Sequence, residues 1–259
     1  MKIHLFNPEH DIALATNVGQ FTAPHAGRAL RADLGFIPAL WANDGDIVVV
    51  DDVEGALESV RHLKRYAADV TFASLEDLHD LLPHDMNSVE LCPWGWDGAV
   101  ASQLKRADDR LLALLPNDEV LKKIREISNR RFAAENVLPN IVAASECLVG
   151  ESHYRDNVDD VVSLVSHIGK CVLKSPWSSS GRGIRYVCDT LQPQQKAWVA
   201  NVIARQGGVM VEPQYSKVAD FGVELYSDGD GGIDFKGFSI FQTVKGAYTG
   251  NLLATEDDK

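Results

Sequence analysis

The sequence predicts an α/β protein in which a mainly parallel β/α domain is followed by a region of α+β character. Over residues 1–116, short apolar segments rich in β-branched residues alternate with segments of helical periodicity, a pattern typical of a parallel sheet covered by helices. Farther along, an apolar segment ending at Lys174 and a second one beginning at Ile184 flank a loop of serines and glycines, which predicts a β-hairpin. A chain of 259 residues is long enough for two domains.

In the first region the apolar segments define the expected strands and the periodic segments the expected helices. Strands are expected at residues 2–6, 37–40, 47–50, 70–72 and 89–92. Helices are expected at residues 24–34, 53–67 and 75–82. The first of these has Pro24 near its start and Gly35 just past its end, which are the residues that helix termini favour. Residues 7–11 read as a polar turn after the first strand.

A domain boundary is expected where Pro116 and Asn117 precede a new helical segment. The predicted domains are residues 1–116 and 117–259, with subdomains of about 117–212 and 213–259. Helices are expected at residues 118–127, 129–136, 158–168 and 194–205, and strands at 141–144, 172–174, 184–188, 209–213 and 237–244. Residues 145–157 read as irregular.

Composition excludes several classes of function. The formal net charge of −12 argues against non-specific nucleic-acid binding, which needs a basic surface. The chain has neither an apolar run of about 20 residues nor a signal-peptide pattern, so no membrane partner and a cytoplasmic location are expected. Cys171 and Cys188 lie on the two hairpin strands and could form a disulfide, but free thiols in a reducing cytosol are the expectation. The histidines show no metal-ligand spacing, so no structural zinc is expected.

The hairpin loop has the residues that bind polyphosphates. Glycine lets backbone N–H groups approach an anion, serine hydroxyls add donors, and Lys174 and Arg182 supply positive charge. No Gly-Lys-Ser/Thr enters a helix here, so this is not a Walker loop. The loop residues are Ser178, Ser179, Ser180, Gly181, Arg182 and Gly183. A surface hairpin with no ligand is the alternative.

Two polar loops in the first region follow predicted strands, where α/β sheets place ligands. One carries His10 and Asp11, and the other carries Trp96 and Asp97. His25 and Arg28 lie one helical turn apart and with Arg31 form a plausible carboxylate-binding face. The alternatives are tryptophans packed between sheet and helix, and a solvated helix face.

Taken in chain order, Lys174, Glu212 and Asp220 resemble the ATP-grasp superfamily. In that superfamily a strand lysine precedes a Gly/Ser-rich hairpin, and a later strand ends in a glutamate at the adenine hinge, before an acidic residue that binds the ribose. The resemblance covers about residues 117–255, and the order and spacing of these short motifs carry it. Residues 1–116 are similar to the domain that precedes many ATP-grasp cores and contributes to the acceptor site.

This resemblance implies roles for individual residues. Arg130 would replace a phosphate-binding lysine, Lys174 would hold the α- and β-phosphates, and the hairpin loop would close over them. Glu212, Pro213, Gln214 and Tyr215 would form the adenine hinge, with Gln214 or Tyr215 as backbone donor because proline has no N–H. Asp220 would accept from the ribose hydroxyls, and Lys245 is a candidate for the γ-phosphate.

The sequence departs from the superfamily pattern at the magnesium ligands. An acidic residue and a Glu-x-Asn pair are expected late in the core, and no Glu-x-Asn occurs before Lys259. Three explanations stay open. The first, which we favour, is that the chain is truncated. The second is that the chemistry has been lost. The third is that residues such as Glu224 and Glu256 substitute.

The function that follows from the resemblance is an ATP-dependent ligase that uses ATP and Mg²⁺. A small-molecule carboxylate would be activated as an acylphosphate and attacked by an amine or thiol, with Lys174, Arg182 and Lys245 stabilising the transferred phosphoryl group. The alternatives are a nucleotide-binding sensor or partner subunit without ligase activity, and an α/β domain that binds no nucleotide. The sequence identifies neither the acceptor nor the oligomeric state, although homodimers are the commonest assembly of soluble proteins.

Overall fold

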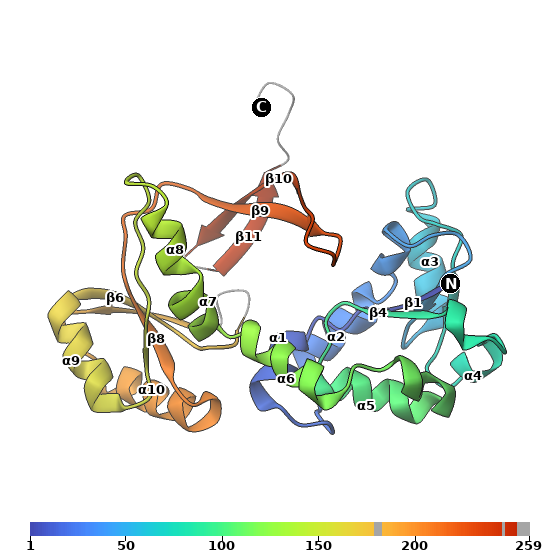
Figure 1. Cartoon of the computed structure of the whole chain (residues 1–259), viewed down its shortest axis with the longest axis horizontal. Coiled ribbons are helices and arrows are strands. Elements are labelled where there is room, and N and C mark those ends of the chain that lie inside the picture. Colours follow the sequence, from blue (N-terminus) through green and yellow to red (C-terminus); the bar gives the residue numbers. More distant parts are fainter. Residues whose placement is uncertain (179–182, 245–246, 253–259) are drawn as a thin grey trace. The chain divides into compact units, whose positions relative to one another are not determined.

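A four-stranded parallel sheet with strand order β3-β2-β1-β4 organises the first of two units, Met1–Phe132 and Ala133–Lys259 (Figure 1). The computed structural model describes residues 1–178, 183–244 and 247–252. The predicted α/β fold class is confirmed, with a parallel sheet in the first unit and antiparallel sheets in the second. The predicted boundary at residues 116 and 117 and the two predicted subdomains stay predictions.

The strands of the first sheet are short and are buried on both faces, as continuous apolar runs in parallel sheets are. They are β1 (Lys2–Leu5), β2 (Ile47–Val49), β3 (Thr71–Ala73) and β4 (Glu90–Pro93). One core cluster, which includes Ile3 and Leu91, packs against Val100 and Leu104 of α5 (Gly98–Ala107). A second cluster on the other face joins Val48 to Ala39 and Phe72.

Helices connect these strands and continue into the second unit. They are α1 (His10–Thr16), α2 (His25–Leu34), α3 (Val53–Arg61), α4 (Leu78–Leu81), α6 (Asp118–Ile127), α7 (Arg130–Asn136) and α8 (Leu138–Ala143), with 3-10 turns η1 (Ile37–Leu40), η2 (Met86–Ser88) and η3 (Asp109–Leu114). The starts of α3, α5 and α6 are each capped by the side chain of the preceding Asp or Asn.

Two predicted strands are wrong. Residues 37–40 form η1, since Pro38 cannot donate to a ladder and the N–H of Ala39 bonds locally to the Phe36 carbonyl. Residues 141–144 belong to α8 and its C-cap, because Pro139 lies in the first turn and favours a helix there. The polar turn also ends earlier than predicted, because α1 begins at His10.

The second unit contains a four-stranded antiparallel sheet and a three-stranded antiparallel sheet. The first has the order β5-β8-β6-β7, from β5 (His153–Arg155), β8 (Val209–Pro213), β6 (Lys170–Lys174) and β7 (Ile184–Cys188). The second has the order β11-β10-β9, from β11 (Ala247–Leu252), β10 (Ile233–Val244) and β9 (Asp220–Ser227). Strand β5 lies in the stretch predicted to be irregular.

One face of the four-stranded sheet is covered by α9 (Val158–Ile168) and α10 (Pro193–Gln206), which lie beside β6 and β8 in Figure 1. Val161 and Val165 of α9 are completely buried against this face, as the helical spacing of the apolar residues predicted. Both helices end at a glycine with positive φ, Gly169 at 85° and Gly207 at 84°. The opposite face of the sheet is therefore available for a site.

The four cysteines are free, as expected. Cys171 is buried and Cys188 is exposed, and each is paired with a different partner across β6 and β7. Among the described residues no helix is long and apolar enough to cross a bilayer.

The buried Asp108 predicts an acid-sensitive element in the first unit. Its side chain is 3% exposed and accepts hydrogen bonds from Arg110 and from the ring of His79. The bonds from the Arg110 side chain hold the pKa of Asp108 well below its ordinary value. A carboxyl with a depressed pKa stabilises the fold above its unfolded pKa of about 3.9 and loses that contribution as the pH falls further.

We therefore expect Asp108→Asn to lower the free energy of unfolding by about 2 kcal/mol at pH 7, and to lose less additional stability between about pH 4 and 2 than the parent does. Urea unfolding across this range measures both effects. Asp109→Asn, at the exposed neighbouring position, is the matched control. If both variants lost equally little unfolding free energy between about pH 4 and 2, Asp108 would not be the source of the acid sensitivity.

Candidate functional site

A cleft of about 850 Å³ lies within the second unit, on the face of the four-stranded sheet that α9 and α10 leave open. It is bounded by β6, β7 and β8, by the segment after β8, and by the ends of β9 and β10 nearest this segment. Its lining residues are Val172, Lys174, Ile184, Tyr186, Glu212, Pro213, Gln214, Tyr215, Ser216, Lys217, Asp220, Phe241 and Thr243.

Lys174 and Glu212 form an ion pair on the floor of this cleft. In the register of β6 and β8, Lys174 is opposite Met210 and Val172 is opposite Glu212. Lys174 and Glu212 are therefore diagonal neighbours on one face, within reach of each other. Their side chains are 29% and 20% exposed, and Glu212 Oε1 also accepts from Ser152 Oγ at 3.0 Å. A cation and an acceptor carboxylate are thus presented side by side to a ligand.

A second polar group lies at the other sheet. Lys217 forms an ion pair with Asp220, and its Nζ donates to Thr243 Oγ1 at 2.8 Å. The hydroxyl of Thr243 donates to Asp220 Oδ2 at 2.7 Å. The bond from Lys217 is the largest cause of a lowered pKa at Asp220. Asp220 is therefore an ionised acceptor at neutral pH.

The segment after β8 offers few backbone donors. Pro213 has no N–H, and the N–H of Gln214 donates to the Lys170 carbonyl at 2.9 Å. Of the two backbone donors predicted for the hinge, Gln214 is therefore engaged, while the N–H of Tyr215 has no backbone partner among the described residues.

The hairpin loop is narrow at its base. Ser175 N donates to the Gly183 carbonyl at 2.9 Å. A Cβ added at Gly183 would lie 2.2 Å from Ser178 Oγ, so only glycine allows this approach. Four predicted loop residues (Ser179, Ser180, Gly181 and Arg182) and the predicted Lys245 and Glu256 lie outside the described residues. Arg130 is the first residue of α7 and belongs to the first unit.

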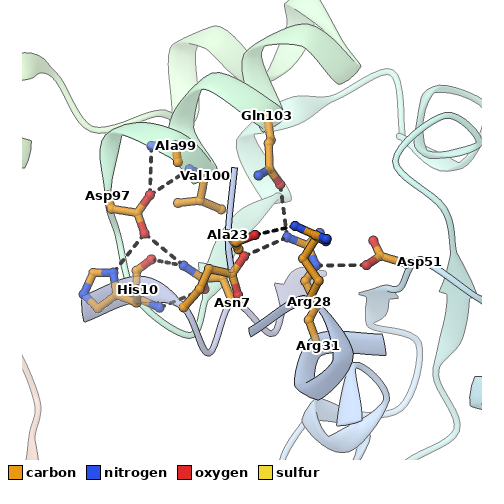
Figure 2. A network of polar contacts seen from close by, with 12 residues as sticks. Asn7, His10, Ala23, Arg28, Arg31, Asp51, Asp97, Ala99, Val100 and Gln103 are labelled. Atoms are coloured by element: carbon orange, nitrogen blue, oxygen red, sulfur yellow. Dashed lines mark hydrogen bonds and ion pairs between the residues drawn. The ribbon is translucent and has the colours of Figure 1, made fainter. Parts of the chain in front are cut away.

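In the first unit, the ends of the adjacent strands β1 and β4 bring Asn7, His10 and Asp97 together, and Figure 2 shows them around one carboxylate. Asp97 Oδ1 accepts from the N–H groups of Ala99 and Val100 at the start of α5. Its Oδ2 lies 3.2 Å from Asn7 Nδ2 and 3.0 Å from His10 Nδ1. Because a carboxylate only accepts, His10 donates from Nδ1, and in the neutral ring its Nε2 is an acceptor.

Close backbone approach completes this cluster. Asn7 Nδ2 donates to the Gly95 carbonyl at 2.8 Å, and Gly95 N donates to Asn7 Oδ1 at 3.1 Å. A Cβ at residue 95 would lie about 2.4 to 2.6 Å from the His10 ring. Gly95 therefore leaves the room that the imidazole occupies. Asp97 itself is 2% exposed and His10 is 19% exposed.

The two arginines of the expected carboxylate-binding face of α2 differ in their surroundings. Arg31 is 11% exposed and contacts Glu9, Gln103 and Asp51, so its charge is already matched (Figure 2). Arg28 is exposed and donates one bond, at 2.5 Å, to the Ala23 carbonyl. The remaining predicted residues are placed separately: His25 is exposed at the start of α2, Asp11 lies in the first turn of α1, and Trp96 packs against the core.

The chain is similar in fold to solved structures of synthetases. The crystal structure of N5-carboxyaminoimidazole synthetase from Staphylococcus aureus complexed with ADP matches with a TM-score of 0.51 at 11% identity, over 95% of this chain and 56% of that chain. The chain has the ATP-grasp fold. D-alanyl-alanine synthetase A from Vibrio cholerae is also similar, with a TM-score of 0.48 and 15% identity over 99% of this chain and 74% of that one. No protein-family model and no curated protein matches the chain.

Within this ATP-grasp fold, the chain spans about half the length of the synthetase structures that it matches. The cleft contains Lys174, Glu212, Pro213, Gln214, Tyr215 and Asp220, all of which the sequence had placed at a nucleotide site. Sequence reasoning missed Ser152, Lys217 and Thr243, which contact Glu212 and Asp220.

Proposed function

We propose that the second unit binds a purine nucleotide, ATP, in the cleft between its two sheets. The observation that carries this proposal is the meeting in one cleft of a cation at Lys174, an acceptor at Glu212 and a carboxylate at Asp220. These groups match the phosphates, the adenine amino group and the ribose hydroxyls of a nucleotide. The cleft volume of about 850 Å³ suits a ligand of this size.

Each residue has a role in this proposal. Lys174 exchanges Glu212 for the α- and β-phosphates, and Glu212 then accepts from the adenine amino group. Tyr215 supplies the backbone N–H of the hinge, since Gln214 is engaged. Asp220, held by Lys217 and Thr243, accepts from the ribose. We retain Lys245 and the loop residues 178–183 as phosphate contacts, as the sequence resemblance implies.

The reaction we propose is carboxylate–amine ligation. A carboxylate oxygen attacks the γ-phosphorus, ADP leaves, and the resulting acylphosphate is attacked by an amine or thiol, which displaces phosphate. The similar fold of a synthetase complexed with ADP supports this reaction class. Positioning and charge stabilisation by Lys174, Arg182 and Lys245 would supply most of the rate enhancement.

For the acceptor we propose the cluster at the ends of β1 and β4. His10 presents Nε2 as an acceptor because Asp97 fixes Nδ1, and Arg28 has an exposed guanidinium able to bind a carboxylate. Asp11, His25 and Trp96 remain further candidate contacts. The acceptor would be a small molecule that carries a carboxylate or an amine.

We propose Mg²⁺ as the companion of ATP, because this ion commonly binds through one or two carboxylates together with the phosphates of a nucleotide. No group of three or more His, Cys, Asp or Glu side chains within residues 1–178, 183–244 and 247–252 is placed to hold a metal ion. No residue in this part of the chain is therefore assigned as a ligand of Mg²⁺.

The test is ADP release by the full chain with ATP and a panel of small carboxylates and amines. We expect release that requires both a carboxylate and an amine and that falls at least about tenfold in Lys174→Ala, a loss of about 1.4 kcal/mol. Tight ATP binding without turnover across the panel would favour the nucleotide-binding sensor. Failure to bind ATP would overturn the proposal.

A further inference from the structure

A second pocket, of about 350 Å³, lies in the first unit and uses none of the residues assigned above. It is lined by Lys2, His4, Leu5, Pro38, Trp41, Asn43, Cys92, Pro93 and Trp94. On this face the inner strands are covered by the apolar cluster around Val48 and Ala39. At β1 and the edge strand β4 the same face carries His4 and Cys92, which are register partners. The pocket therefore begins where the apolar cover ends.

His4 is the polar group built into this pocket. Its side chain is 6% exposed, and its Nε2 lies 3.1 Å from Asp46 Oδ2. Asp46 is also buried and accepts from the N–H groups of Lys2 at 2.7 Å and Asn43 at 2.9 Å. Because the carboxylate accepts, Nε2 of His4 is the donor. Nδ1, which is an acceptor in the neutral ring, has no hydrogen-bond partner among the described residues.

Two exposed tryptophans form one side of the pocket. Trp41 is 51% exposed and Trp94 is 61% exposed. Their ring centroids are 6.0 Å apart at an angle of 48°, and Trp94 also packs edge-on against Phe6 at 5.5 Å. The two rings touch each other, so a ligand would stack on an open ring face rather than enter between them. Adjacent indoles with this much free surface are suited to a planar ring.

The other lining groups favour binding of a neutral molecule over catalysis. Burial raises the pKa of the Cys92 thiol to about 11, so this sulfur is a protonated thiol at neutral pH and a poor nucleophile. Lys2 already forms an ion pair with Glu90 at 3.3 Å, which leaves little net charge for an anion. The side-chain amide of the exposed Asn43 can both donate and accept.

We propose that this pocket binds a small planar heterocycle with a ring N–H beside a carbonyl, the lactam edge found in pyrimidine and purine bases. The ring N–H donates to Nδ1 of His4, and the ring stacks on Trp41, whose indole touches that of Trp94. The carbonyl accepts from Lys2 or from the Asn43 amide. Asp46 determines the selectivity, because by holding Nε2 it requires the neutral His4 ring to accept at Nδ1.

The test uses uracil as the probe and 1,3-dimethyluracil as its matched control, which keeps the ring and carbonyls but has no N–H. Binding to the full chain is measured by calorimetry and by the shifts of the indole N–H resonances in nuclear magnetic resonance spectra. We expect uracil to bind about tenfold more tightly than the dimethyl compound, because the dimethyl compound cannot donate a hydrogen bond to the His4 ring. Saturating ATP should leave uracil binding unchanged.

Two variants locate the binding site. Trp41→Leu removes an exposed ring without opening the core, and should weaken uracil binding several-fold. Tyr66→Ala removes an aromatic ring that is 71% exposed elsewhere in the same unit, and should have no effect. The proposal is overturned if uracil does not bind, if both probes bind equally, if Trp41→Leu binds as the parent does, or if ATP displaces uracil.

Discussion

Lys174→Ala is expected to weaken ATP binding by roughly 10- to 100-fold. The ammonium of Lys174 lies in the cleft beside Glu212. Lys174 is also the last residue of β6, directly before the hairpin loop. A hydrogen bond to a charged group contributes roughly 1.5–3 kcal/mol, and each 1.4 kcal/mol is tenfold in affinity. Adenosine has no phosphates, so its affinity should change less than about twofold. Calorimetric titration of both ligands measures the difference.

The controls separate local chemistry from net charge. Lys196→Ala, at an exposed position on α10, changes the charge equally and should leave ATP affinity unchanged. Glu212→Gln should lower the affinity for adenosine, because a neutral amide oxygen accepts a hydrogen bond from the adenine amino group less strongly than a carboxylate does. If Lys174→Ala weakened ATP and adenosine alike, the assignment of Lys174 to the phosphates would be wrong.

The regular elements of both units were largely predictable because their residues repeat with the period of a strand or a helix. Val161 and Val165 are buried on one face of α9, and residues 47–50 form the buried strand β2 and the residue that follows it. The two wrongly predicted strands are apolar segments, each with a proline, within it or shortly before it, that indicates a helical turn. Pro38 and Pro139 both favour helical turns, yet each was placed in or beside an expected strand.

The candidate nucleotide cleft was predictable only in part. The order of Lys174, Glu212 and Asp220 in the sequence was informative because each lies at the end of a strand that borders the cleft or one residue from it. Thr243 could not be placed, since its bond to Asp220 depends on the antiparallel pairing of β9 with β10. The pocket beside His4 was equally hidden, because residues 2–6 read as an ordinary buried strand.

Asp97→Ala is expected to destabilise the first unit by roughly 3 kcal/mol. The carboxylate is 2% exposed and serves four donors at once: two backbone N–H groups at the start of α5, the amide of Asn7 and the ring of His10. Loss of a helix cap alone costs about 1 kcal/mol. Leaving buried donors unpaired adds roughly 1–3 kcal/mol. Urea unfolding of the full chain, followed by far-ultraviolet circular dichroism, measures the change.

The matched control is Asp52→Ala, which removes an exposed helix cap that accepts from Gly55 N at 3.0 Å and should cost only about 1 kcal/mol. Asp97→Asn should lie between the two alanine variants. Its oxygen can still cap α5, but its amide then faces the donors of Asn7 and His10. The cluster would not be a cooperative network if Asp97→Ala cost no more than Asp52→Ala. That result would also weaken the argument that Nε2 of His10 is an acceptor. This argument depends on the bond from His10 Nδ1 to Asp97 Oδ2, the same oxygen that accepts from Asn7.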